Sequence, residues 1–142
     1  MNTGRIIHIS GPVTDVKFES GALPRIKDAL TVENGGRTYV MEVASHVGGD
    51  TVRCVMLGPG EGLSRGAEVR ATGDVIKVPV GECTLGRMFN ALGDPIDGAA
   101  SPDGAERWPI HRAAPSFEEQ SSVAEVLETG IKVIDLMEPY AK

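Results

Sequence analysis

Short runs of alternating apolar and polar residues fill the first half of the chain. Between Val13 and Phe18 the side chains at 14, 16 and 18 alternate with Asp15 and Lys17, a period of two that predicts a strand with Val16 and Phe18 on its buried face. Comparable runs predict five further strands, at residues 5–9, 29–33, 37–43, 51–57 and 75–80.

The turns between these runs are rich in glycine. The Asn-Gly-Gly sequence at 34–36 is typical of a tight hairpin, and the Gly-Gly-Asp sequence at 48–50 predicts a second one. Pro79 has no N–H to donate, so the last predicted strand is confined to an edge or terminal position.

The glycines of residues 58–66 resemble a phosphate-binding fingerprint, but Arg65 occupies the place of the third glycine, and we interpret the segment as a turn. Six short strands with no helical spacing between them are best buried when the sheet closes into a small barrel, which leaves no exposed edge. A two-sheet sandwich fits the same turn spacing.

Beyond Gly81 the apolar residues recur at helical spacing, at positions 85, 88, 89 and 92. With Thr84 as N-cap and Gly93 as the C-terminal stop, a short amphipathic helix is predicted. Its polar face carries Arg87 and Asn90, and an ordinary exposed helix arginine is favoured over a contact to a neighbouring subunit.

Several carboxylates follow this predicted helix. Asp94 and Asp97 flank Pro95 in a turn signature, so we expect them to cap backbone N–H groups and not to form a general acid and base pair. Residues 107–112 are expected to be extended, and Glu118 and Glu119 are expected to be a solvated pair.

The last part of the chain contains two predicted helical segments. Ser122 and Glu125 form a capping-box pattern that opens a brief helical turn through Leu127. Thr129 is expected to cap a second helix that Pro139 ends. This helix is apolar over most of its circumference, so it and the apolar residues near 85 and 89 are expected to expose an apolar patch, whereas residues up to about 80 fold as a unit.

Length and charge limit the possible classes of protein. The 142 residues suit one ordinary domain, or one small domain plus part of another, and 18 glycines favour β structure over a helical bundle. A net charge of −6 and an aromatic content of 4% disfavour nucleic-acid binding. The sequence has neither a signal peptide nor an apolar run of the roughly 20 residues that cross a bilayer, so a soluble protein is expected.

Neither cysteines nor histidines suggest a metal site. Cys54 and Cys83 are too few and too far apart for a disulfide framework, and two reduced thiols are expected. His8, His46 and His111 are scattered singly along the chain, which favours surface or hydrogen-bonded histidines over ligands.

Four segments together resemble the catalytic β subunit of F-type ATP synthases: residues 4–18, 78–97, 107–120 and 127–142. The turn at 94–97 is shared with the sister α subunit and with flagellar and vacuolar relatives. The sequences Ile-His-Arg-Ala-Ala-Pro at 110–115 and Asp-Leu-Met-Glu-Pro-Tyr at 135–140 resemble the β version, which favours the β subunit.

This resemblance implies a mainly β fold, with a six-stranded β-barrel domain over residues 1–80 and the incomplete start of an α/β P-loop nucleotide-binding domain over 81–142. In the family the chain continues into a Gly-x-x-x-x-Gly-Lys-Thr loop, whereas these 142 residues contain no Gly-Lys pair. No catalytic, cofactor-binding or metal-binding residue is therefore carried over. ATP, ADP and Mg²⁺ are implied only for the full-length family member.

The implied function is that of part of a catalytic β subunit of a rotary, proton-translocating ATP synthase, with this chain inactive alone. Implied partners are the α subunits and other subunits of the soluble head, in a hetero-oligomeric ring that meets the membrane only through the complex. The implied location is the cytoplasmic face of a bacterial membrane, or an organelle-encoded counterpart. The alternatives are a non-catalytic barrel that serves as an interaction module and, more weakly, the RNA-binding barrel of a hexameric helicase.

Overall fold

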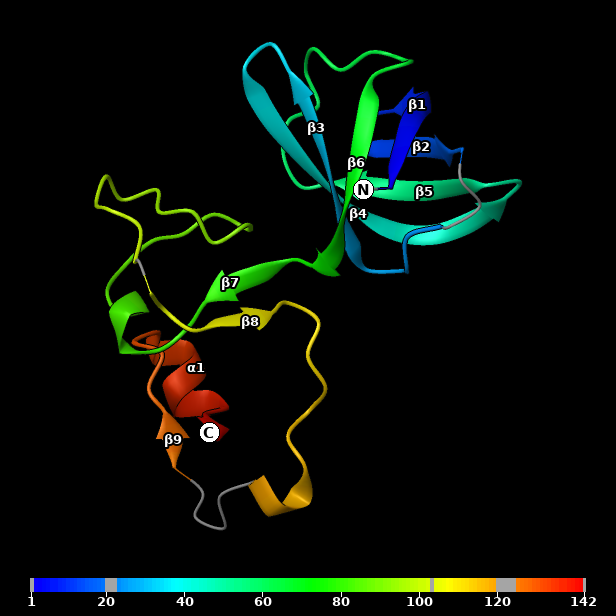
Figure 1. Cartoon of the computed structure of the whole chain (residues 1–142). Coiled ribbons are helices and arrows are strands. Elements are labelled where there is room, and N and C mark those ends of the chain that lie inside the picture. The colour runs from blue at the N-terminus through cyan, green and yellow to red at the C-terminus, as the bar shows by residue number, and fades with distance from the viewer. Residues whose placement is uncertain (1, 20–22, 103, 120–124, 142) are drawn as a thin grey trace. The chain divides into compact units, whose positions relative to one another are not determined.

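The computed structural model describes residues 2–19, 23–102, 104–119 and 125–141 (Figure 1). Two compact units are present, Met1–Arg112 and Ala113–Lys142. The predicted division into folding domains at residue 80 stays a prediction. No helix among the described residues is long and apolar enough to span a membrane.

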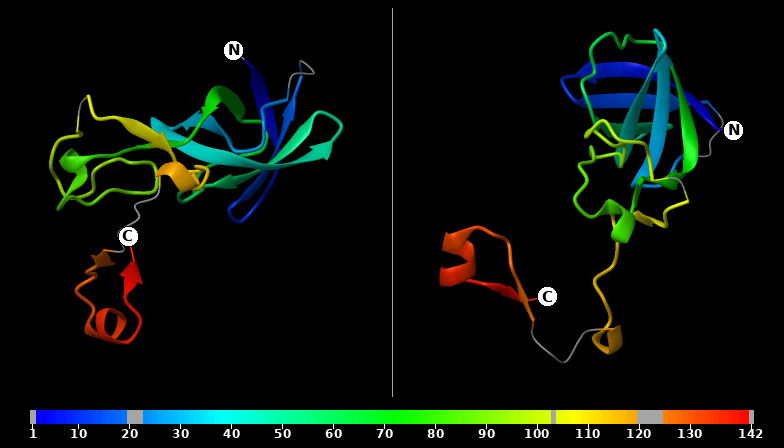
Figure 2. Two further views of the ribbon diagram at one scale, coloured as in Figure 1. Left: turned by 90° about the horizontal axis from the view of Figure 1, so that it is seen from below. Right: turned by 90° about the vertical axis from the view of Figure 1, so that its left-hand side faces the viewer.

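Six antiparallel strands of the first unit form a closed barrel in the order β1-β2-β5-β4-β3-β6, seen from three sides in Figures 1 and 2. The strands are β1 (Thr3–Ser10), β2 (Val13–Phe18), β3 (Asp28–Asn34), β4 (Arg37–Gly48), β5 (Thr51–Met56) and β6 (Glu68–Val75). The predicted closed barrel is confirmed, and the sandwich is excluded. The seam is formed by the first residues of β1, where Gly4 pairs with Val69 of β6.

Inward-facing side chains from all six strands make up one core cluster. Val16 and Phe18 are fully buried on β2, as the alternation predicted. The cluster contains Ile6, Val16, Phe18, Leu30, Val32, Met41, Val43, Val52, Cys54, Met56 and Val69. Both predicted hairpins are confirmed, with Asn34 paired to Arg37 across one turn and β4 paired to β5 across the other.

One buried side-chain oxygen inside the barrel has no hydrogen-bond partner among the described residues. Thr14 is fully buried and its hydroxyl makes no hydrogen bond within the part of the chain that the structure describes. A buried hydroxyl without a partner costs free energy because it has lost its contacts with water. Replacing Thr14 by the similarly shaped valine is therefore expected to raise the free energy of unfolding by about 1 kcal/mol, measured by urea denaturation. A loss of stability would show that the hydroxyl is hydrogen-bonded in solution.

A strand is present within the predicted segment 75–80, but its predicted place in the barrel is wrong. Residues 75–80 do not close the barrel: β7 (Lys77–Pro79) forms a separate two-stranded ribbon with β8 (Arg107–Pro109), while β6 at Glu68–Val75 fills the sixth place. Of the β6 residues only Val69 is buried, so this strand lacks the strong alternation that marks the others. The prediction of extended chain from 107 is confirmed for β8.

The predicted helix at 84–92 is also wrong. A single 3₁₀ turn (Glu82–Thr84) is followed by a hairpin in which Phe89 bridges to Pro95. Two of the supposed apolar-face residues are largely exposed, Leu85 at 75% and Met88 at 59%, so a helix here has no surface to pack on. A short helix without tertiary packing is not stable in water.

The second unit contains the helix that the sequence predicted. The 3₁₀ turn η2 (Phe117–Glu119) comes first, then β9 (Val126–Leu127) pairs with β10 (Tyr140–Ala141), and α1 (Lys132–Met137) lies between them in sequence. Its N-cap is Ile131 and not Thr129. The Thr129 hydroxyl instead accepts the Ile131 N–H and donates to Asp135.

Other predictions for this unit have mixed outcomes. The predicted helical turn that ends at Leu127 is wrong for its described end, which is strand, and Ser122 lies outside the described residues. Leu136 and Ile131 are exposed, as expected, whereas Ile134 is half-buried.

Candidate functional site

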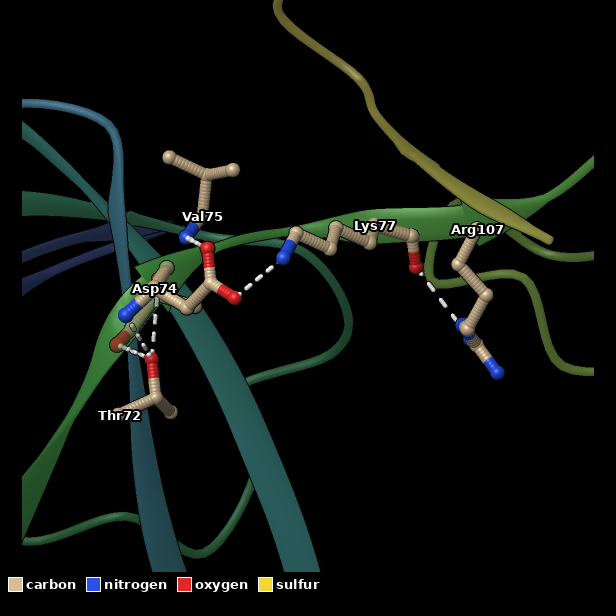
Figure 3. A network of polar contacts seen from close by, with 6 residues as sticks. Thr72, Asp74, Val75, Lys77 and Arg107 are labelled. Carbon is tan, nitrogen blue, oxygen red and sulfur yellow. Dashed lines mark hydrogen bonds and ion pairs between the residues drawn. The ribbon is translucent and has the colours of Figure 1, made fainter.

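The exit of the chain from the barrel is fixed by a small polar network (Figure 3). The Thr72 hydroxyl donates to the Ala29 carbonyl of β3 at 2.8 Å and accepts the Asp74 N–H at 3.3 Å. The Asp74 carboxylate accepts hydrogen bonds from the Lys77 ammonium and from the Val75 N–H. These contacts, with that of Lys77 the strongest, hold the pKa of Asp74 below its ordinary value.

One further contact joins the two strands of the β7–β8 ribbon, and another ties the ribbon to the barrel. Arg107 donates to the Lys77 carbonyl at 3.3 Å, from β8 to β7, as Figure 3 shows. After β8, the Nε2 atom of His111 lies 2.8 Å from a Glu42 carboxylate oxygen on barrel strand β4. The ribbon is thus connected to the barrel both before β7 and after β8.

Arg87 and Asp97 form the principal ion pair of the hairpin that follows β7. The guanidinium of Arg87 contacts Asp97 through two hydrogen bonds, at 2.5 and 3.1 Å, and donates a third to the Ala100 carbonyl. The two side chains are only 23% and 16% exposed. The prediction of an ordinary exposed helix arginine at Arg87 is therefore wrong, because the segment is a hairpin whose two arms this pair joins.

Asp97 also accepts hydrogen bonds from the N–H groups of Ala99, at 3.1 Å, and Met88, at 3.4 Å, which confirms its predicted capping role. The Arg87 side chain, followed by the Ala99 N–H, holds the pKa of Asp97 far below its ordinary range. An anion stabilised in this way contributes to stability above the pKa of the unfolded chain, about 4, and this contribution is lost as the pH falls toward the folded value.

Acidification is therefore expected to open the 88–97 hairpin selectively. Between neutral pH and about pH 4 the protection of the Met88 and Ala99 amides against hydrogen exchange should stay constant, and below that it should fall as Asp97 is protonated. The Asp97→Asn variant should have low protection already at pH 7 and little further change. Equal acid sensitivity in both proteins would assign the transition to another group.

Asn90 closes the tip of the same hairpin. Its side-chain oxygen accepts the N–H groups of Leu92 and Asp94, each at 2.9 Å, and its amide donates to the Asp94 carboxylate at 3.0 Å. The expectation that Asp94 caps a backbone N–H is therefore wrong, since its carboxylate receives a side-chain donor. Asp94 and Asp97 bind different partners and do not form an acid and base pair.

A groove lies between the barrel and this hairpin tip, with a volume of about 400 Å³. Arg37 and Tyr39 of β4, Met56 at the end of β5, and the loop residue Glu61 line its barrel side. The opposite side is formed by the hairpin tip, including Leu92 and Asp94. The sequence indicates turns at 58–66 and at 94–97, but it does not show that residues 56–61 and 90–94 line one groove. That proximity arises only because the fold brings segments far apart in sequence together.

The remaining candidate residues do not converge. Burial raises the pKa of the Cys54 thiol to about 12, and Cys83 is exposed and also unpaired. His46 bonds the Pro24 carbonyl at 2.8 Å, in line with the expected satisfied histidines. Among the described residues no three His, Cys, Asp or Glu side chains gather in a way that could hold a metal ion.

The fold defines a small antiparallel β-barrel domain followed by a short ribbon and hairpin. Residues 6–73, from β1 into β6, match the family described as the ATP synthase alpha/beta family, beta-barrel domain. The barrel of this chain is therefore similar to the beta-barrel domain of that family. The matched segment includes all six observed strands at least in part and ends before β7.

Proposed function

We propose that this chain is part of the catalytic β subunit of a rotary, proton-translocating ATP synthase of the F type. The family match of the barrel carries this proposal as far as the α/β family. The choice of the β subunit is supported by the β-like segments at 110–115 and 135–140, which lie outside the matched residues. The partners are then the α subunits and other subunits of a soluble head, attached as a peripheral complex to the cytoplasmic face of a bacterial membrane.

A second candidate function is that of a non-catalytic interaction module. It is favoured by the absence of any Gly-Lys pair from the 142 residues, because a phosphate-binding loop of the P-loop type requires a lysine after its last glycine. ATP, ADP and Mg²⁺ then act only in the full-length family member. On either proposal this polypeptide alone is catalytically inactive.

Calorimetry with Mg-ATP tests the activity of the polypeptide itself. We expect no heat of binding, because neither clustered backbone N–H groups nor a lysine is available to hold the phosphates. Micromolar affinity for ATP would contradict both proposals. Binding of ADP, even without any binding of Mg²⁺, would also contradict the proposed lack of a nucleotide site.

Assembly with purified subunits tests the proposed family member. The chain is expected to co-elute in size-exclusion chromatography with an F-type α subunit and not with an F-type β subunit, because α subunits are its proposed partners in a hetero-oligomeric ring. An α-subunit barrel would show the reverse preference. The Gly4→Ala variant serves as the control for a folded interface, because an added Cβ at this position would lie 2.8 Å from the Lys17 carbonyl oxygen and weaken the barrel.

A further inference from the structure

The barrel side of the groove is held in place by hydrogen bonds between distant segments. The Tyr39 hydroxyl donates to the Glu61 carbonyl at 2.7 Å, and the Asn34 side-chain amide donates to the Gly62 carbonyl. The Leu57 N–H also donates to the Val40 carbonyl at 3.0 Å. The loop that carries Glu61 is therefore fastened to the β3–β4 hairpin at several points.

The hairpin side is equally constrained. Asn90 closes its tip through three hydrogen bonds, and Gly93 packs so tightly on β7 that an added Cβ would lie 2.5 Å from the Pro79 ring. Both walls therefore exist before any ligand binds. A preformed site loses less conformational entropy on binding than a flexible one.

The chemistry of the groove combines an apolar floor with charges of both signs. Met56 is buried, and Tyr39 and Leu92 are half-buried beside it. The exposed lining residues include the guanidinium of Arg37 and the carboxylates of Glu61 and Asp94.

Two of these charges have no partner among the residues that the structure describes. The side chains of Arg37 and Glu61 have no hydrogen bond or ion pair with any residue that the structure describes, whereas Asp94 accepts only the Asn90 amide through one of its two carboxylate oxygens. Unpaired charges of opposite sign in one groove match a ligand that carries both signs.

We propose that this groove docks an extended segment of a partner polypeptide, with an acidic side chain for Arg37, a basic side chain for the Glu61 and Asp94 carboxylates, and apolar side chains on the Met56 floor. The volume of about 400 Å³ falls in the range of protein ligand sites. Two carboxylates against one guanidinium disfavour nucleic acid and phosphate as occupants. This docking site goes beyond the proposed function and is tested without reference to ATP or to an α subunit.

Peptide titration of the ¹⁵N-labelled full chain tests the proposal by NMR. The probes are the blocked tetrapeptides acetyl-Glu-Leu-Leu-Lys-amide and, as neutral control, acetyl-Gln-Leu-Leu-Gln-amide. The charged peptide is expected to shift the amide signals of Tyr39, Glu61 and Asn90 saturably, with millimolar affinity. The neutral peptide should bind about two- to fivefold more weakly, because exposed ion pairs contribute only modestly.

Matched variants distinguish the groove from general charge effects. Arg37→Gln and Glu61→Gln are each expected to lower the affinity for the charged peptide by about twofold or more and to leave the affinity for the neutral peptide unchanged. Arg65→Gln removes an exposed charge from the same loop outside the groove lining and should change neither affinity.

Three outcomes would overturn the proposal. These are equal binding of the two peptides, an equal effect of Arg65→Gln, and no shift of the groove signals at saturating peptide. Shifts of the same signals on dilution without peptide would likewise overturn it, in favour of a second copy of this chain in the groove.

Discussion

Replacing Gly4 with alanine is expected to lower the free energy of unfolding of the barrel by about 3 kcal/mol. Gly4 is buried in β1, between Phe18 of β2 and Val69 of β6 in the ladder. A Cβ at this position would lie 2.8 Å from the Lys17 carbonyl oxygen and 2.9 Å from a Val16 methyl carbon. The carbonyl belongs to the neighbouring strand, so relieving the contact requires β1 to move away from β2 at the seam.

Urea denaturation followed by circular dichroism measures this effect, with Gly58→Ala as the control. A Cβ at Gly58 meets nothing within 4 Å, and its backbone has no positive φ. The control is expected to change the unfolding free energy by less than about 0.5 kcal/mol. Equal stability of the two variants would show that the strands accommodate a methyl group at the seam.

Replacing Gly93 with alanine is expected to detach the 88–97 hairpin from β7 while the barrel stays folded. The φ of Gly93 is +80°, which costs an L-residue about 1 to 2 kcal/mol. In addition, the new Cβ would lie 2.5 Å from Pro79 Cδ and 3.1 Å from Val78 Cα. Because the Val78 atom is backbone, the hairpin must move, and its opening free energy should fall by about 3 kcal/mol in total.

Gly98→Ala is a matched control for this variant. Gly98 has a φ of +79°, nearly the same strain, but an added Cβ meets nothing within 4 Å. Hydrogen exchange at Gly93 and Ile96, whose N–H groups bond within the hairpin, should accelerate much more in Gly93→Ala than in Gly98→Ala. Similar exchange in the two variants would mean that backbone strain and not packing on β7 decides the outcome.

The strands that the sequence predicts well are those with two or more buried side chains in alternation. Val16 and Phe18 on β2, or Val52 and Cys54 on β5, leave a clear period of two. β6 contributes only Val69 to the buried core and bulges near Gly73, so its pattern is weak, whereas residues 75–80 have a strong pattern that the ribbon uses. The sequence therefore predicts six barrel strands correctly, but it assigns the sixth place to residues 75–80 instead of to β6.

The apolar spacing at 84–92 predicts a helix where the structure has a 3₁₀ turn and a hairpin, because such spacing says nothing about competing local hydrogen bonds. Asn90 binds the backbone of Leu92 and Asp94, and Asp97 binds that of Met88 and Ala99, which favours turns over helix. An Asn four residues before an Asp-Pro pair is the signal that was available. The groove has no such signal, since its two walls meet only through the tertiary fold.

The seam between β1 and β6 has a consequence for synthesis on the ribosome. Arg5 and Glu68 pair there, so the first strand made must wait for the last one before the cylinder can close. Contacts between residues so far apart in sequence form slowly, because a long loop has to be ordered first. Until β6 emerges, the nascent chain exposes the unpaired edges of β1 and β3, and these are the edges at which premature association with other nascent chains is expected.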